Sequence, residues 1–184
     1  SRPHPPPPPL CTRIRPPAVH TLEAVFNSLR HTPRFRSDDG PVPSGSKVLD
    51  GYAAPGALGV VALSLRAVFV TLMDNHADSL KLIKANLALI GAQRQASVLN
   101  RSGLNPGTSP APMDLIMMDP PYNEDLAEPA LKALLENNWI GDKTIIAVEL
   151  AAKQVLPEIP ELEQLDTRKY GAAKLVILRK IASS

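Results

Sequence analysis

Cysteine is almost absent from this sequence of 184 residues, and the single thiol is Cys11. One cysteine cannot form an internal disulfide, and it cannot build a cysteine-rich metal site. The four histidines also lie at no spacing that is typical of metal ligands; they are His4, His20, His31 and His76. We therefore expect a protein that uses no metal ion.

Long hydrophobic runs are missing as well. No apolar run reaches the roughly 18 residues that a membrane-spanning helix needs. The first residues also lack the apolar core of a signal peptide. These two features predict a cytoplasmic protein that does not associate with a membrane.

A strong net charge of either sign is absent too, because the formal charge of the whole chain is only +2. Residues 1–36, however, hold six arginines and one acid, which leaves a net charge of −3 for the remainder. A basic arm on a slightly acidic body suits a polyanionic partner such as nucleic acid, which Arg13, Arg15 and Arg30 would contact. A solvated basic tail would explain the charge equally well.

Proline is concentrated at the start of the chain. Residues 1–17 contain eight of the twenty prolines, and polyproline cannot form a helix or a sheet ladder. We expect residues 1–17 to be a flexible, proline-rich arm. The remaining 167 residues, 18–184, suit one domain. We expect the protein to be a monomer.

From Lys47 onward, the hydrophobic pattern alternates between strand and helix. Near-continuous apolar strands that alternate with helices predict a parallel sheet covered on both faces. The fold class is α/β: a Rossmann-like, doubly wound, mostly parallel sheet of about seven strands, with one antiparallel strand near the C-terminus. We expect helices at 19–30, 56–65, 77–90 and 126–137, a loop at 37–46, strands at 47–50, 67–73, 96–99, 114–118 and 144–150, and a hairpin of 163–170 with 173–180.

The motif with the most specific chemistry is Asp119-Pro120-Pro121-Tyr122, which directly follows an apolar strand. The amino group of an aromatic base is a poor nucleophile because its lone pair is delocalised into the ring. A carboxylate and a proline-fixed carbonyl can accept hydrogen bonds from that group and orient its lone pair toward a methyl donor. The tyrosine offers a face for stacking. The alternative interpretation is an ordinary turn after a strand.

Two upstream acids suggest a nucleotide-like cofactor. Asp50 lies between a short strand and a loop of small residues, which runs into a helix as on a ligand-binding edge. Asp74 ends the next strand, where an acid can accept hydrogen bonds from ribose hydroxyls. Taken alone, the first segment could be an ordinary turn, and Asp74 could be a helix N-cap.

The order of these segments resembles the bacterial RsmD family, whose members methylate the exocyclic amino group of a guanine in small-subunit ribosomal RNA. The resemblance rests on the arginine-proline segment, LEAVFNSL, VLDGYAAPGALGVVALS, the acid Asp74, the DPPY motif and RKYGAAKLVILRK. It implies a class I methyltransferase that uses S-adenosylmethionine and acts on ribosomal RNA of the small subunit. The implied cofactor-binding residues are Asp50, Tyr52, Ala54, Gly56, Asp74 and Asn75, and the implied catalytic residues are Asp119, Pro120, Pro121 and Tyr122.

The sequence departs from the family pattern around the cofactor. Ala54 replaces the first glycine of the cofactor loop, Pro55 follows it, and the segment 100–103 lacks the acid that the family has after its third strand. These departures leave a second interpretation open, in which the chain binds RNA or ribosomal subunits with weak or no catalysis. A DNA amino-methyltransferase is a third interpretation, but nothing in the sequence resembles a target-recognition domain of useful size.

Overall fold

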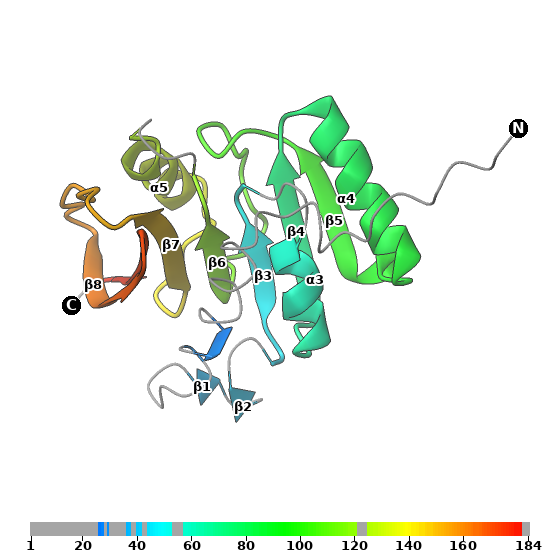
Figure 1. The fold of residues 1–184 in the computed structure, drawn as a ribbon, viewed down its shortest axis with the longest axis horizontal. Coiled ribbons are helices and arrows are strands. Elements are labelled where there is room, and N and C mark those ends of the chain that lie inside the picture. Colours follow the sequence, from blue (N-terminus) through cyan, green and yellow to red (C-terminus); the bar gives the residue numbers. More distant parts are fainter. Residues whose placement is uncertain are drawn as a thin grey trace, which may run out of the picture.

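The structure of this chain is a computed structural model that describes residues 26–27, 29, 36–37, 40–41, 44–52, 57–120 and 125–181. Seven of its strands form one sheet in the order β5-β4-β3-β6-β7-β9-β8 (Figure 1). They are β3 (Lys47–Asp50), β4 (Phe69–Asp74), β5 (Ala96–Asn100), β6 (Leu115–Met118), β7 (Ile145–Ala151), β8 (Leu162–Tyr170) and β9 (Ala173–Lys180).

The pairing of these strands confirms the predicted fold class. β3 pairs in parallel with β4 on one side and with β6 on the other, while β4 pairs in parallel with β5 and β6 with β7. Only β9 reverses direction in this sheet, because it pairs antiparallel with both β7 and β8. The chain therefore builds a doubly wound sheet with one antiparallel strand near its C-terminus.

Helices cover both faces of the sheet, as the apolar character of the central strands requires. The helices α3 (Ala57–Ser64) and α4 (Ala77–Leu89) lie on one face, where Ala62, Ile83 and Leu87 join the core. The helix α5 (Ala127–Glu136) lies on the other face. This division follows from right-handed crossovers, because the chain moves outward from β3 to β5 and then in the opposite direction from β6.

The sequence of α5 explains why this segment is a helix. Ala127, Ala130, Leu131 and Leu134 are all buried, and their spacing places them on one helical face. Pro129 lies in the first turn, where a backbone N–H has no partner within the helix. The predicted position of this proline is confirmed.

The boundary before β4 differs from the prediction by two residues. The expected strand at 67–73 begins instead at Phe69, because the residues before it close helix α3. The backbone N–H of Ala67 donates to the carbonyl of Ala62 at 3.0 Å, and Arg66 adopts a left-handed φ of 71°. This is the geometry with which helices commonly end.

A small antiparallel pair lies at the start of the segment 37–46, which we expected to be only a loop, and begins one residue before it. β1 (Arg36–Ser37) pairs with β2 (Gly40–Pro41), with Arg36 opposite Pro41 and Ser37 opposite Gly40. Of the helix expected at 19–30, the structure describes residues 26, 27 and 29 as helical, and it buries Phe26 and Leu29. The arm at 1–17 lies outside the described residues.

Among the described residues, no helix combines the length and the apolar character that crossing a bilayer would demand.

Candidate active site

Three acidic residues follow neighbouring strands at one edge of the sheet. Asp50 ends β3, Asp74 ends β4, and Asp119 comes directly after β6. In the register of the sheet, Asp50 is paired with Leu72 of β4 and with Met117 of β6. The chain changes its direction of progress between β3 and β6, and such a switch point is where open α/β sheets bind ligands.

The carboxyl group of Asp50 is buried among these acids, and its side chain is only 1% exposed. The pKa of the Asp50 carboxyl is raised from 3.8 to about 8, mainly by burial and in smaller part by the charges of Asp119 and Asp74. The backbone N–H of Tyr52 donates to Asp50 Oδ1 at 3.3 Å, and this hydrogen bond lowers the pKa of Asp50. The structure therefore brings together the three acids that the sequence singled out.

Asp74 holds the turn that leads into α4. Its Oδ1 accepts a hydrogen bond from the backbone N–H of His76 at 2.9 Å and lies 3.3 Å from His76 Nδ1. His76, not Asp74, is the N-cap residue of α4, so the N-cap interpretation of Asp74 is wrong. The helix begins two residues later than that interpretation requires. Asn75, between the two, is exposed.

The aromatic ring of Tyr52 lies against Gly103, in the loop that follows β5. A Cβ atom added to Gly103 would lie 3.3 Å from Cε2, Cζ and the hydroxyl oxygen of Tyr52. The loops after β3 and β5 therefore meet across the end of β4, which lies between those two strands. Tyr52 forms part of a wall on the side of the edge where Asp74 lies.

The long connection from β5 to β6 is fixed at both ends. The backbone N–H of Arg101 donates to the carbonyl of Asp74 at 3.1 Å. Farther along, Trp139 Nε1 donates to the carbonyl of Gly107 at 2.7 Å, and Asn138 Nδ2 donates to that of Ser109 at 3.0 Å. These bonds hold the loop that carries Gly103 against the body of the protein.

The DPPY motif is described in its first half. Asp119 is exposed and Pro120 is buried, whereas Pro121 and Tyr122 lie outside the described residues. The backbone N–H of Gly51 donates to the carbonyl of Met117 at 2.9 Å, so the chain after β3 is joined directly to the strand that carries the motif.

Other predicted site residues also lie outside the described part of the chain. Ala54 and Gly56 of the cofactor loop belong to this group, as do the arm residues Arg13, Arg15 and Arg30. Their assigned roles stay predictions.

The chemistry of this edge suits a cationic organic ligand. A buried carboxyl with a raised pKa, next to two further acids, favours a group that brings positive charge to it. S-adenosylmethionine carries an ammonium and a sulfonium, so the acids of this edge fit it. Within the described ranges, no group of three or more His, Cys, Asp or Glu side chains could hold a metal ion.

Two residues of this edge, His76 and Gly103, are not among the site residues that the sequence predicts. The sequence marks His76 only by its lack of metal-ligand spacing, and Gly103 only as part of a segment that lacks an acid. A glycine shortly after a strand, at the ligand-binding edge, is a signal that could have identified Gly103, because close backbone approach needs the absent Cβ.

Residues 7–179 match the family described as "Conserved hypothetical protein 95". The ribosomal RNA small subunit methyltransferase D of Haemophilus influenzae is 34% identical over 141 residues, which cover 74% of this chain and 67% of that protein. The protein of the same name from Escherichia coli K12 is 33% identical over 163 residues, which cover 86% and 75%.

Solved structures give a similar result. The structure of a putative methyltransferase from Escherichia coli has a TM-score of 0.75 and 28% identity, and the match covers 92% of this chain and 88% of that one. The structure of a putative methylase from Haemophilus influenzae has a TM-score of 0.73 and 28% identity, and the match covers 91% of this chain and 100% of that one.

Proposed function

We propose that this chain, which belongs to the conserved hypothetical protein 95 family of RsmD-type methyltransferases, transfers a methyl group from S-adenosylmethionine to the exocyclic amino group of a guanine in small-subunit ribosomal RNA. The observation that carries this proposal is the position of Asp119-Pro120. This start of the DPPY motif follows β6 at the switch point of the sheet, beside the buried Asp50.

The acids at the ends of β3 and β4 would hold the cofactor. Asp50 would accept hydrogen bonds from the amino group of the methionine part, and Asp74 from the ribose hydroxyls. Tyr52 would wall the pocket on the side of Gly103, and Asn75, Ala54 and Gly56 would complete it. When bound, S-adenosylmethionine supplies an electrophilic methyl group on a sulfonium.

The residues after β6 would hold the target base. The Asp119 carboxylate and the Pro120 carbonyl accept hydrogen bonds from the amino group of the base, which aims its lone pair at the methyl donor. Tyr122 stacks on the base, and Pro121 stiffens the loop between them. The base must be unpaired or leave its helix to reach this site.

Asp119 need not be a strong base before the reaction. The amino group becomes acidic only as the new C–N bond forms, so its proton can leave late, to Asp119 or to water. The transfer is direct, without a covalent bond between enzyme and methyl group.

A second candidate function is RNA binding with little catalysis. Ala54 and Pro55 favour it, because alanine would be strained if the loop required a positive φ where the family has glycine, and proline has no backbone N–H to donate to a cofactor.

Two single substitutions test the proposal. Asp119→Ala should reduce turnover far more than cofactor binding, whereas Asp74→Ala should mainly weaken cofactor binding. The assay is transfer of labelled methyl to small ribosomal subunits that lack the modification, with calorimetric titration of S-adenosylmethionine.

The matched control is Asp142→Ala, because Asp142 is an exposed acid before β7. Equal turnover of wild type and Asp119→Ala would remove Asp119 from the mechanism. Absence of turnover in wild type, with RNA binding intact, would favour the second candidate.

A further inference from the structure

The carboxyl edge of the sheet carries lysines on the half that does not contain the acids. Lys153 follows β7, Lys169 lies near the end of β8, and Lys174 lies at the start of β9. We call these three residues the edge lysines. Lys153 and Lys169 are exposed and Lys174 is half-buried. The acids lie instead at the ends of β4, β3 and β6, on the other half of the same edge.

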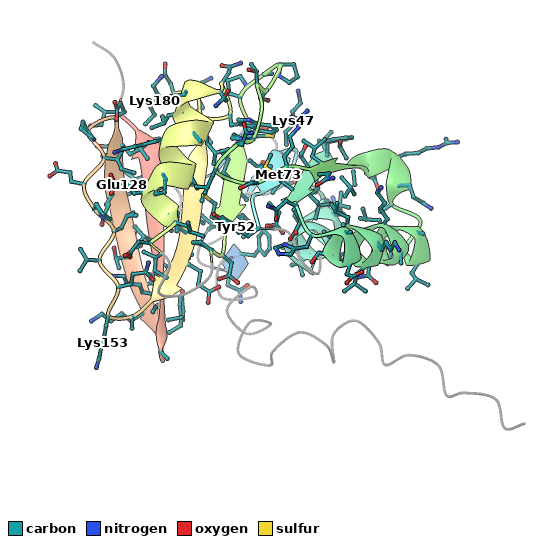
Figure 2. All side chains as sticks on the ribbon, turned by 90° about the horizontal axis from the view of Figure 1, so that it is seen from above. Lys47, Tyr52, Met73, Glu128, Lys153 and Lys180 are labelled. Atoms are coloured by element: carbon teal, nitrogen blue, oxygen red, sulfur yellow. The ribbon has the colours of Figure 1, made fainter. Side chains whose placement is uncertain are left out.

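Backbone pairing places the edge lysines next to one another. Lys174 is paired in register with Lys169 of β8 and with Leu150 of β7. The backbone N–H of Ala152, next to Lys153, donates to the carbonyl of Ala172 at 2.8 Å. Figure 2 shows Lys153 at the end of the sheet opposite to Lys180, which marks the other end of β9.

Two of the edge lysines form an unfavourable pair. Lys169 and Lys174 lie directly opposite each other across an antiparallel ladder, where like charges repel and destabilise the pairing. Within the described part of the chain, none of the three lysines has an ion pair with an acid. Arg168, the adjacent cation, differs from them because its Nε lies 2.9 Å from Asp166 Oδ2. Among the residues that the structure describes, these three lysine charges therefore lie without an ion-pair partner.

We propose that the edge lysines bind the phosphate backbone of the RNA strand on one side of the target base. This inference rests on the proposed function, because it takes the base to be held at Asp119. Neighbouring strands lie about 4.8 Å apart, so β7, β9 and β8 place the lysines roughly 5–15 Å along the edge from the strand that precedes Asp119. That span lies within reach of the nucleotides next to a base at the site.

The division of charge along the edge explains why phosphates would bind at the edge lysines. Asp74 and Asp119 repel a polyanion, and the buried Asp50 offers it no positive charge, so the base and the cationic cofactor suit this half of the edge better than phosphates do. The lysines attract the backbone and would orient the strand so that a base points toward the acids. Contacts of this kind fix position without reading sequence.

Neutralisation of the three lysines tests this surface. The variant Lys153→Gln/Lys169→Gln/Lys174→Gln is compared with a control of equal charge change, Lys81→Gln/Lys84→Gln/Lys143→Gln. The control residues are exposed and lie on α4 and before β7. The probe is a labelled single-stranded RNA of the small-subunit sequence, titrated at several salt concentrations.

We expect the edge variant to lose about tenfold or more in RNA affinity at 0.15 M salt, and its salt slope to fall by about 2, since each lost phosphate contact removes roughly 0.7 from the slope. The control should keep the slope of the wild type. Cofactor affinity should be unchanged in both variants.

A charge reversal at one position separates binding from folding. Lys174→Glu turns the repulsive pair with Lys169 into an attractive one, so it should raise Tm by about 1–3 °C while it weakens RNA binding. If Lys174 served only the structure or the solubility, Lys174→Glu would not combine a higher Tm with weaker RNA binding.

The outcomes distinguish this inference from the proposed function. If the edge variant binds RNA like the control, or the wild type shows no salt-dependent RNA binding, the surface is not an RNA site, whatever the methyl-transfer assay shows. If RNA binding falls only in the edge variants while wild type transfers no methyl group, the surface stands and the catalytic proposal fails.

Discussion

The ring of Tyr52 lies so close to the backbone of Gly103 that a Cβ at position 103 would lie 3.3 Å from three of its atoms. Tyr52 follows β3 and Gly103 follows β5, so this contact joins two loops that are separated by the end of β4. The pair forms a wall beside Asp74, on the side of the edge where we propose that the cofactor binds. A larger residue at position 103 must therefore move the ring.

Gly103→Val should displace Tyr52 and weaken the binding of S-adenosylmethionine about tenfold, because overpacking of this kind typically costs about 1–3 kcal/mol. Calorimetric titration measures the effect. In the double variant Gly103→Val/Tyr52→Ala, the clash is absent. The losses in cofactor affinity caused by the two single substitutions should therefore not add. Strict additivity would show that the contact does not shape the cofactor pocket.

The raised pKa of Asp50 predicts how stability depends on pH. Unfolding returns this carboxyl from a pKa of about 8 to an ordinary value near 3.8, so between these values the folded protein holds a proton that the unfolded chain has lost. Asp50 should therefore lower the stability as pH rises from about 4 to 8, by up to roughly 1.4 kcal/mol per pH unit.

Chemical denaturation of wild type and Asp50→Asn at several pH values measures this contribution. The free energy of unfolding of wild type should fall relative to that of the variant across the window and level off above pH 8. Parallel curves for the two proteins would show that Asp50 ionises normally in the fold.

The same carboxyl should couple cofactor binding to proton release. We expect a cationic cofactor to favour the ionised form of Asp50, so the apparent affinity should rise with pH below about 8, by up to about tenfold per unit. Calorimetry in two buffers of different ionisation enthalpy measures the released proton. Asp50→Asn should bind more weakly and release no proton from this position, and equal release by both proteins would contradict the assignment.

The altered cofactor loop gives a further prediction. Ala54→Gly with Pro55→Ser should tighten the binding of S-adenosylmethionine, because glycine tolerates positive φ and serine restores a backbone donor. The measurement is a dissociation constant for each protein. Ala57→Gly, at the first residue of α3, is the control for added flexibility near the loop. An unchanged dissociation constant in the double variant would show that this loop does not limit affinity.

Much of the fold could be predicted from local patterns in the sequence. The apolar strands, the helical spacing of Leu131 and Leu134, and the hairpin around Gly171 all appear in the predicted order and within about two residues of the predicted bounds. The comparisons also confirm the resemblance to RsmD-type methyltransferases, which rested on the order of segments. Such signals succeed because hydrophobic periodicity reflects which face of an element is buried.

The site depended on information that no local pattern contains. Asp50, Asp74 and Asp119 are 24 and 45 residues apart along the chain from one acid to the next, and only the strand order brings them to one edge. The burial that raises the pKa of Asp50 and the meeting of Tyr52 with Gly103 likewise arise from packing.

The sequence by itself therefore determined the elements, their order, the family and the acids that end the strands. Only the tertiary structure decided which of these residues lie together, and it placed the edge lysines, Lys153, Lys169 and Lys174, on the same edge as the acids. The physical reason is that secondary structure follows from neighbours along the chain. The electrostatic field and the side-chain contacts at a site follow instead from strand order and register, which are set by the packing of the whole sheet.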